Sequence, residues 1–249
     1  MKIFPLSEGT FTIDHKKVFV PFDTSTDQLL NRPKGSLLVE IQPFLVVTAN
    51  DIILFDSGLG YAKGGVLQIF ENLSNFGFAS TDVTKVLISH LHRDHAGALI
   101  VADTFSKSPY LAFPHADYYI QQKELEFVLS GRSSSFDASY FSYLKGHEKV
   151  TQLEGNGVID GYIHYEESGG HSPHHQVFWV KQNDEIIFFG GDEAPQLQQM
   201  RTRFVAKYDS DGKKAMELRQ KWWEQGGIEQ WTFLFYHDIK TPFFQNKKG

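Results

Sequence analysis

The sequence predicts a layered α/β or α+β protein that folds as one domain over residues 1–249. Three observations favour this class. Strand-length apolar runs alternate along the chain with segments of helical periodicity. The length of 249 residues and a hydrophobic content of 41% suffice for one large core. No internal repeat and no low-complexity linker divides the chain.

The first half of the chain predicts a hairpin, a helix and a short buried strand. Ser36–Thr48 and Asp51–Phe55 are rich in apolar and β-branched residues, and Ala49-Asn50 between them favours a turn. In Gly65–Asn75 the apolar residues recur on one face at helical spacing. Lys85–Ser89 is predicted to be a buried strand, and a polar, histidine-rich segment follows it directly.

The second half predicts regular elements around one irregular excursion. Ser130–Gly146 is rich in serine and aromatic residues without a clear period, so we expect a surface excursion that could serve as a lid. Its Tyr140, Phe141 and Tyr143 could wall a pocket, although ordinary packing explains them equally well. The regular elements are helices over Ala116–Leu129 and Lys213–Gln225 (the latter ended by Gly226-Gly227), a hairpin of Val177–Lys181 and Glu185–Phe189 turned at Asn183-Asp184, and a strand over Trp231–Tyr236.

The composition excludes several classes of protein. The chain has no cysteine, so disulfides and catalytic thiols are excluded and a transition metal would need His, Asp or Glu ligands. A net charge of -6 lacks the basic excess that is typical of a nucleic-acid surface. No apolar run reaches membrane-spanning length, and Met1–Thr10 lacks the pattern of a secretory signal. We therefore expect a cytoplasmic protein with a small-molecule substrate and with no nucleic-acid or membrane partner.

Residues of metal-binding type stand at the ends of four apolar strands. These residues are His90 after Lys85–Ser89, His171 before Val177–Lys181, Asp192 after Glu185–Phe189, and His237 after Trp231–Tyr236. Loops at strand ends are where α/β folds place their chemistry, so we expect these residues to contribute to one site.

The densest signal is the run His90-Leu91-His92-Arg93-Asp94-His95. Chance produces three histidines and one aspartate in this pattern in roughly one sequence per thousand of this composition. In an extended chain His90 and His92 point to the same side and can share one ion. Asp94 and His95 begin a helical turn and can face a second ion. Groups packed this closely would lose hydration without a cation, which favours a metal site over a solvated loop with incidental histidines.

This run resembles the H-x-H-x-D-H signature of the metallo-β-lactamase superfamily. Further motifs similar to that family's follow in order: Gly170-His171-Ser172-Pro173-His174-His175, the strand-ending Gly191-Asp192, and His237-Asp238, while Phe55-Asp56-Ser57-Gly58 resembles its D-[ST]-G turn. The resemblance spans residues 36 to 238. It implies a four-layer αβ/βα sandwich of the α+β class, in which two mixed β-sheets are flanked by helices.

The resemblance also implies a binuclear metal site. One ion would be held by His90, His92 and His171, the other by Asp94, His95 and His237, and Asp192 would bridge the two. Asp56 would orient a ligand histidine through a hydrogen bond, His174 stands where relatives often have glycine, and His175 is expected outside the ligand set. The family's usual ion is zinc, and mixed nitrogen and oxygen ligands also permit Mn, Fe or Co.

Within the superfamily, the chain resembles the compact N-acyl-homoserine lactonase-like branch. The gaps of 21 residues from His171 to Asp192 (192 − 171) and of 45 to His237 (237 − 192) are similar to those of that branch. Tyr118–Glu126 resembles its helix with a Q-x-x-E pattern. Asp192-Glu193-Ala194-Pro195 departs from it, because those lactonases carry a substrate-contacting tyrosine shortly after the bridging aspartate. The departure weakens the homoserine lactone assignment and leaves the ester or lactone class in place.

The expected activity is metal-dependent hydrolysis, in which a metal-bridging hydroxide attacks an ester or lactone carbonyl. Asp94 and Asp192 would be the catalytic carboxylates that orient the hydroxide and carry its proton. A phosphodiester or phosphotriester hydrolase on the same ions is the alternative, and it predicts a basic residue near the metals, for which Arg93, Arg201 and Arg203 are candidates. A non-catalytic metal-binding relative is a third hypothesis, which a complete ligand set disfavours. A homodimer is compatible with the sequence.

Overall fold

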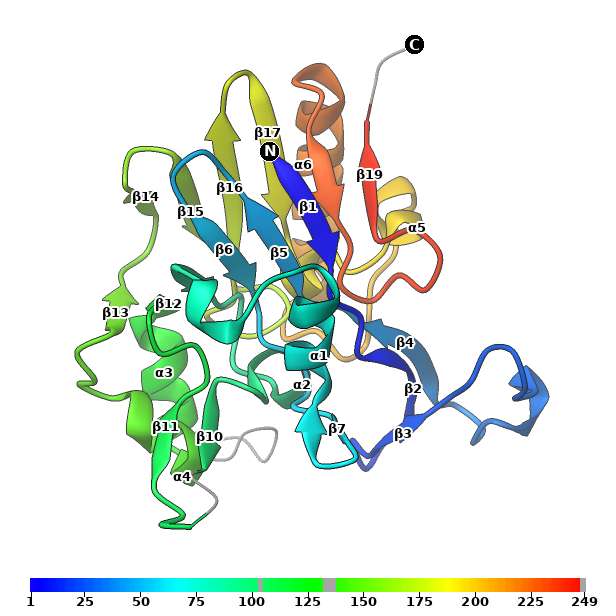
Figure 1. The fold of residues 1–249 in the computed structure, drawn as a ribbon. Helices are drawn as coiled ribbons and strands as arrows, with labels where there is room; N and C mark the ends of the chain where they lie inside the picture. The colour runs from blue at the N-terminus through cyan, green and yellow to red at the C-terminus, as the bar shows by residue number, and fades with distance from the viewer. Residues whose placement is uncertain (103–104, 132–137, 247–249) are drawn as a thin grey trace.

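Two six-stranded β-sheets lie at the centre of the molecule (Figure 1). The computed structural model describes residues 1–102, 105–131 and 138–246. The first sheet has the strand order β1 (Lys2–Pro5), β5 (Phe44–Val47), β6 (Ile52–Phe55), β9 (Lys85–Leu87), β12 (Asp117–Gln121) and β13 (Val150–Leu153). The second has the order β14 (Gly157–Ile159), β15 (Ile163–Glu167), β16 (Gln176–Gln182), β17 (Glu185–Phe189), β18 (Thr232–Leu234) and β19 (Phe243–Gln245). Each sheet contains parallel and antiparallel pairs, so both are mixed.

Smaller elements complete the chain. A three-stranded sheet is formed by β3 (Phe19–Pro21), β2 (Gly9–Ile13) and β4 (Leu37–Ile41), and two hairpins by β7 (Ala62–Lys63) with β8 (Val66–Leu67) and β10 (Ile100–Ala102) with β11 (Pro109–Leu111). The α-helices are α1 (Gln68–Asn75), α2 (Arg93–Ala96), α3 (Gln122–Leu129), α4 (Ala138–Phe141), α5 (Leu197–Arg201) and α6 (Gly212–Ile228). The 3-10 turns are η1 (Leu29–Asn31), η2 (Ser80–Asp82), η3 (Ser142–Leu144) and η4 (Gly191–Glu193). Within the described ranges, no helix has both the length and the apolar character needed to cross a bilayer.

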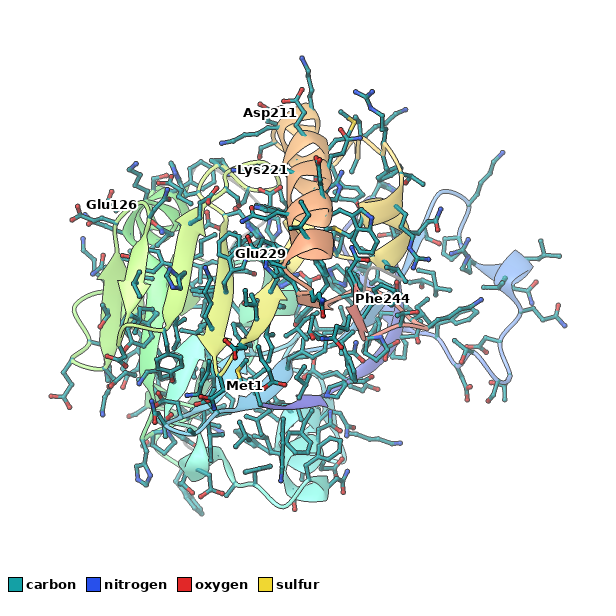
Figure 2. All side chains as sticks on the ribbon, turned by 90° about the horizontal axis from the view of Figure 1, so that it is seen from above. Met1, Glu126, Asp211, Lys221, Glu229 and Phe244 are labelled. Atoms are coloured by element: carbon teal, nitrogen blue, oxygen red, sulfur yellow. The ribbon has the colours of Figure 1, made fainter. Side chains whose placement is uncertain are left out.

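The alternation of side chains along the central strands builds three apolar cores. Successive residues of a strand point to opposite faces, so Phe44 and Phe55 of the first sheet pack inward against Phe178 and Phe189 of the second. The outward-facing residues form two further cores: Leu45, Leu54 and Val86 pack with α1 and α3, and Val177, Trp179 and Phe188 pack with α5 and α6. Four layers result, with helices outside and sheets inside, and Figure 2 shows α6 running along one outer face between Asp211 and Glu229.

Buried glutamines connect the two sheets at the end where the histidine-rich segment lies. Gln176, the first residue of β16, donates from its side chain to the carbonyl of Ile88 at 2.7 Å and from its backbone to the carbonyl of Ser89 at 2.9 Å. Gln121, the last residue of β12, donates to the side-chain oxygen of Gln176 at 3.1 Å. These hydrogen bonds join β16 of the second sheet to the ends of β9 and β12 in the first sheet.

The first predicted hairpin forms, but its first strand is shorter than expected. Ser36–Thr48 is interrupted at Gln42-Pro43: β4 pairs with β2 in the small sheet, and only β5 pairs with β6, with Val47 opposite Ile52. Proline has no N–H to donate to a ladder, so the chain changes sheets at this point.

The predicted helix over Ala116–Leu129 is wrong in its first half. Asp117–Gln121 forms β12, a parallel strand between β9 and β13 in which Tyr118 lies opposite Val86 and Val150. Pairing on both sides and full burial of Tyr118 override the local helical pattern. The helix α3 begins only at Gln122.

Two other predicted helix boundaries also differ. The helix predicted from Gly65 begins at Gln68, because Gly65 has a φ of 85° and belongs to the turn of the β7–β8 hairpin. The predicted stop at Gly226-Gly227 is wrong, because α6 continues to Ile228. A Cβ atom on Gly226 would lie 2.4 Å from the ring of Phe233, so this glycine permits close packing of helix on strand.

The remaining predictions are mostly confirmed. The second hairpin forms from β16 and β17, and the strands predicted from Lys85 and Trp231 form over the shorter ranges of β9 and β18. Ser130–Gly146 contains α4 and η3, while residues 132–137 lie outside the described residues.

Candidate metal centre

All seven residues predicted as metal ligands lie together at one end of the two sheets. His90 and His92 follow β9, and α2 then carries Asp94 and His95. The second half of the chain supplies His171 before β16, Asp192 in η4 after β17, and His237 after β18. The ligand atoms form two groups, His90, His92, His171 and Asp192 in one and Asp94, His95 and His237 in the other, and within each group they lie within 4.8 Å of one another.

Asp192 connects the two groups. Its Oδ2 lies 3.1 Å from Nε2 of His171, and its Oδ1 lies 3.0 Å from Nε2 of both His95 and His237. In the first group, Nδ1 of His92 lies 2.8 Å from Nε2 of His90 and 3.0 Å from Nε2 of His171. One carboxylate therefore faces both groups of imidazoles.

Acceptors outside the groups fix the tautomers of His171 and His237. Nδ1 of His171 lies 2.8 Å from Oδ1 of Asp209, and Nδ1 of His237 lies 2.7 Å from the backbone carbonyl of Glu40. A carbonyl and a carboxylate accept only, so each Nδ1 carries the hydrogen. In the neutral imidazole, each Nε2 then directs a lone pair toward Asp192.

The predicted contact of Asp56 with a ligand histidine is present. Its Oδ2 accepts from Nδ1 of His95 at 2.7 Å and from the hydroxyl of Ser89 at 2.7 Å. The Ser89 oxygen in turn lies 3.0 Å from Nδ1 of His90, which donates to it because the hydroxyl hydrogen is already used by Asp56. Asp56 is fully buried and adopts a φ of 54°. Its carboxylate contacts His95 directly and His90 through the hydroxyl of Ser89.

The chemistry of these atoms fits a cation. Nε2 of His95 and Oδ1 of Asp192 are buried without a hydrogen-bond partner, and they face each other at 3.0 Å. With Nδ1 of His95 donating to Asp56, the neutral imidazole presents a lone pair to Oδ1 of Asp192, and the two atoms repel unless a proton or a metal ion lies between them. The described residues of the cluster offer the nitrogen and oxygen donors that divalent transition metals prefer.

The pKa values follow the same electrostatics. Burial and the neighbouring imidazoles hold the pKa of His90 and of His92 well below the usual range, so both are neutral and able to bind a metal. Burial disfavours the charged form of His95, but the carboxylates of Asp192 and Asp94 outweigh it and raise the pKa of His95. Burial opposes the ionised form of Asp192 as well, but the surrounding imidazoles lower its pKa well below 3.8. The surroundings of His95 and Asp192 therefore favour a positive charge at this position.

Three acidic residues that were not predicted as site residues support the site. Asp209 lies in the loop between α5 and α6, outside any motif. Glu193 accepts from the backbone N–H groups of Gly170 and His171 at 2.5 and 2.9 Å. Glu124 accepts from the N–H of Leu91 at 3.1 Å, between two ligand histidines. Glu193 directly follows Asp192 and Glu124 belongs to the Q-x-x-E pattern of Tyr118–Glu126, so of the three only Asp209 lies outside every sequence signal.

A fourth such residue is Glu8, which holds the loop after Asp56. The N–H of Leu59 donates to its carboxylate at 2.6 Å, and the adjacent Gly58 accepts from Gly97, which ends α2. Burial raises the pKa of Glu8 to about 8, and the charge of Asp94 adds to the shift. Glu8 thus supports the turn against which α2 packs.

Other residues singled out in the sequence lie elsewhere. The hydroxyl of Tyr140 donates to the carbonyl of Gly97 at 3.0 Å, and Phe141 is buried in the outer core, so both make packing contacts. Arg201 lies over the rings of Trp223 and Phe244 at 5.7 and 5.0 Å, on the outer face of the second sheet. The basic residue expected for phosphoester chemistry is therefore not supplied by Arg201.

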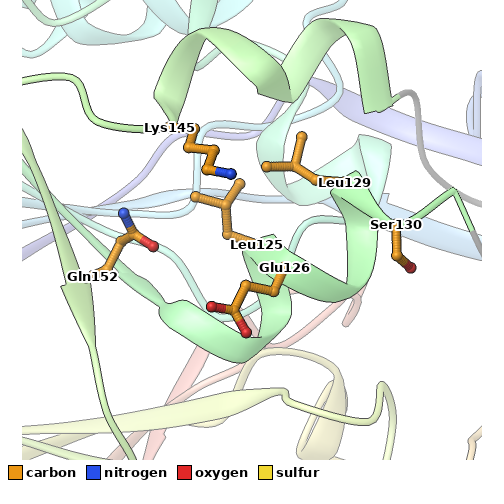
Figure 3. A pocket seen from close by; sticks show the side chains of 6 residues that line it. All are labelled: Leu125, Glu126, Leu129, Ser130, Lys145 and Gln152. Carbon is orange, nitrogen blue, oxygen red and sulfur yellow. The ribbon is translucent and has the colours of Figure 1, made fainter.

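The remaining two histidines of the GHSPHH element lie outside the two groups. His174 lies 2.7 Å from Glu167, and Nδ1 of His175 lies 2.9 Å from the hydroxyl of Ser168. A separate cavity of about 250 Å³ opens beside α3 and is shown in Figure 3. It is lined by Leu125, Glu126, Leu129, Ser130, Lys145 and Gln152. None of the seven predicted metal ligands is among them.

The class of protein that this fold and these donors define is a metal-dependent hydrolase. The sequence pattern of the metallo-beta-lactamase superfamily matches residues 40–237, which is most of the chain. The chain belongs to the metallo-β-lactamase superfamily. The predicted family and its four-layer α+β sandwich are thereby confirmed. No curated protein matches the chain.

Solved structures share this fold at low sequence identity. A probable metal-dependent hydrolase from Staphylococcus aureus is 22% identical, with a TM-score of 0.77 over 99% of this chain and 92% of that one. AidC, a dizinc quorum-quenching lactonase in complex with a product, is 18% identical, with a TM-score of 0.73 over 99% and 90%. An N-acyl homoserine lactone hydrolase with N-hexanoyl-L-homoserine at its catalytic metal centre is 20% identical, with a TM-score of 0.66 over 96% and 94%.

Proposed function

We propose that the chain is a single-domain, binuclear hydrolase of carboxylic esters or lactones. The observation that carries the proposal is the convergence of the Nε2 atoms of His95, His171 and His237 on the carboxylate of Asp192. Two solved structures of the same fold are described as lactonases, one of them dizinc, which favours this substrate class and zinc. The acidic composition favours a small molecule over a nucleic acid as the substrate, and the proposed compartment is the cytoplasm.

Each protein group has a distinct role in the proposal. His90, His92 and His171 would hold one ion, Asp94, His95 and His237 would hold the other, and Asp192 would be a ligand common to both. When bound, such ions supply Lewis acidity and lower the pKa of water so that a nucleophile forms near neutral pH. The carboxylates of Asp94 and Asp192 orient the attacking water and accept its proton. Asp56 fixes the ring of His95, and Asp209 fixes the ring of His171.

The test is alkali consumption by the metal-reconstituted protein on N-hexanoyl-homoserine lactone. Asp192→Asn should abolish turnover, because it removes the charge shared by the two ions, and Asp184→Asn in the exposed β16–β17 turn is the matched control. Metal content per chain is measured for all three proteins. Two bound ions without lactone turnover would refute the proposal and would direct the same assay to phosphodiester and phosphotriester substrates.

A second variant tests the ligand assignment itself. His92→Ala should lose metal as well as activity, because its Nδ1 lies against Nε2 of both His90 and His171. Loss of activity with unchanged metal content would contradict the role of His92 as a ligand.

A further inference from the structure

The outer face of the second sheet carries a cavity that is separate from the metal centre. It has a volume of about 420 Å³ and lies between the strands β14, β15 and β16 and the helix α6. We name it the α6 cavity; its lining includes Trp179, Lys181 and Lys221 and none of the seven predicted metal ligands. Pockets that bind small organic molecules have volumes of about 300–1,000 Å³. The α6 cavity is therefore large enough for a small ligand.

The cavity forms because α6 covers only one end of a row of paired residues. The row crosses four strands and consists of Val158, His164, Trp179 and Phe188. Helix α6 packs on the Phe188 end, where the ring of Trp222 lies 5.0 Å from that of Phe188. The ring of Trp179 packs toward the same end, at 5.1 Å from Phe188 and 6.2 Å from Trp222. The other end of the row stays open, because Val158 is 49% exposed and lines the cavity together with His164.

The inner wall of the α6 cavity is aromatic. Trp179, Trp222 and Trp231 all line it and are buried. Indole rings offer large flat apolar surfaces on which another aromatic ring packs well. The indole N–H of Trp179 is also buried and has no acceptor among the described residues. A buried donor without a partner costs free energy, so a ligand that brings an acceptor to Trp179 gains affinity.

The outer edge of the α6 cavity is cationic. Lys181 comes from the sheet and Lys221 from α6 (Figure 2), and both are exposed. Among the described residues, neither ammonium group has an ion pair or a hydrogen bond. Burial and the charge of Lys181 lower the pKa of His164, so this imidazole is neutral at pH 7. Glu166 is the one acidic residue of the lining, and two lysines against one glutamate give a net charge of +1.

A further carboxylate beside the cavity is already bound by other groups. The charge of Lys181 reaches Glu229, which directly follows α6. The two oxygens of Glu229 accept from the side chains of Gln225 and Trp231, each at 2.9 Å. Glu229 is thereby held in hydrogen bonds that do not involve Lys181, so the lysine can bind an anion in the cavity.

We propose that the α6 cavity binds a small aromatic carboxylate, whose ring packs against Trp179 and whose carboxylate is bound by Lys181 and Lys221. A single negative charge matches the net charge of the lining. Because exposed ion pairs contribute little free energy by themselves, the aromatic contact and the charge are both needed for binding. An inorganic anion lacks the first and a neutral aromatic molecule lacks the second. The inference is independent of the hydrolytic activity proposed above.

The test is calorimetric titration of the metal-loaded protein with 2-naphthoate and with its neutral analogue 2-naphthamide. We expect the amide to bind about tenfold more weakly than the carboxylate. In the double variant Lys181→Met and Lys221→Met, which keeps the length of both side chains, the Kd of 2-naphthoate should rise about tenfold. The double variant Lys2→Met and Lys63→Met makes the same change of net charge at exposed positions of β1 and β7 and serves as the matched control. Its Kd should equal that of the wild type.

Four results would overturn the inference. The first is an absence of 2-naphthoate binding up to about 1 mM. The second is equal affinity for the carboxylate and the amide, which would exclude recognition of the charge. The third is equal weakening in the two double variants, which would reduce the effect to overall charge. The fourth is binding that a chelator abolishes and that the variant at Lys181 and Lys221 leaves unchanged, which would place 2-naphthoate at the metal centre.

Discussion

Replacing Glu8 with glutamine should change how the stability of the protein depends on pH. The carboxyl of Glu8 is buried, accepts from Leu59 and has a pKa raised from 4.5 to about 8 by burial. Glutamine keeps an oxygen that can accept from Leu59 and cannot ionise. The comparison therefore isolates the ionisation of one side chain.

The sign and size follow from linkage. In the unfolded chain Glu8 loses its proton near pH 4.5, whereas in the folded protein it keeps the proton until about pH 8. Between these values unfolding releases a proton, so the free energy of unfolding falls as pH rises. At about 1.4 kcal/mol per pH unit the full cost is about 5 kcal/mol, of which about 4 kcal/mol develops between pH 5 and pH 9.

The assay is urea unfolding of the wild type and Glu8→Gln at five pH values from 5 to 9, with the same metal content. We expect the stability of the variant relative to the wild type to rise by about 4 kcal/mol across this range. Every other titrating group is common to both proteins and cancels in the difference. Parallel stability curves for the two proteins would refute the reasoning, because they would mean that Glu8 ionises alike in the folded and unfolded states.

Four further predictions concern the metal centre and α6. Asp209→Asn should lower metal affinity about 10- to 100-fold in a chelator competition, because it weakens the acceptor that orients His171. Gly226→Ala should destabilise the protein by about 1–3 kcal/mol in urea unfolding, since the added methyl group would meet Phe233. Gly227→Ala should instead stabilise it by up to about 1 kcal/mol, because only a flexible side chain lies nearby. Removing metal with a chelator should lower Tm by about 5–10 °C, and adding metal should restore it.

Each of these predictions has a control. Asp184→Asn, in the exposed β16–β17 turn, should retain metal affinity. Equal metal affinity in Asp209→Asn and the wild type would contradict the orienting role of Asp209. Equal effects of the alanine substitutions at Gly226 and Gly227 would contradict the packing argument. A Tm that does not respond to chelation would mean that folding does not depend on bound metal.

The ligand set was predictable because its members stand in short motifs at strand ends. His90 to His95 are adjacent in sequence, and Asp192 directly follows a glycine at the end of a strand. The groups that orient the ligands were less predictable. Asp209 is 38 residues from His171 in sequence, and the acceptor for His237 is the backbone carbonyl of Glu40, which any residue could supply.

The fold was predictable where one local signal dominates and was missed where two compete. The strand β17 is a short apolar run directly after the turn at Asn183-Asp184, and it was predicted with its observed bounds. Tyr118–Gln121 fits a helix or a strand equally well, and only its pairing with β9 and β13 decides between them. Gly226 has the local signal of a helix end, but its contact with Phe233 comes from a distant strand that no local pattern reveals.

The glutamine link between the sheets has a consequence for the metal centre. Apolar packing between the sheets is non-directional and by itself does not select a single alignment of one sheet on the other. The hydrogen bonds of Gln176 to Ile88 and Ser89 are directional, and a slip of one residue would break them. The two sheets carry different ligands, so their relative position sets every distance across the centre. The uncharged side chain of Gln176, which is not among the predicted ligands, thereby fixes the position of the ligands after β9 relative to those carried by the second sheet.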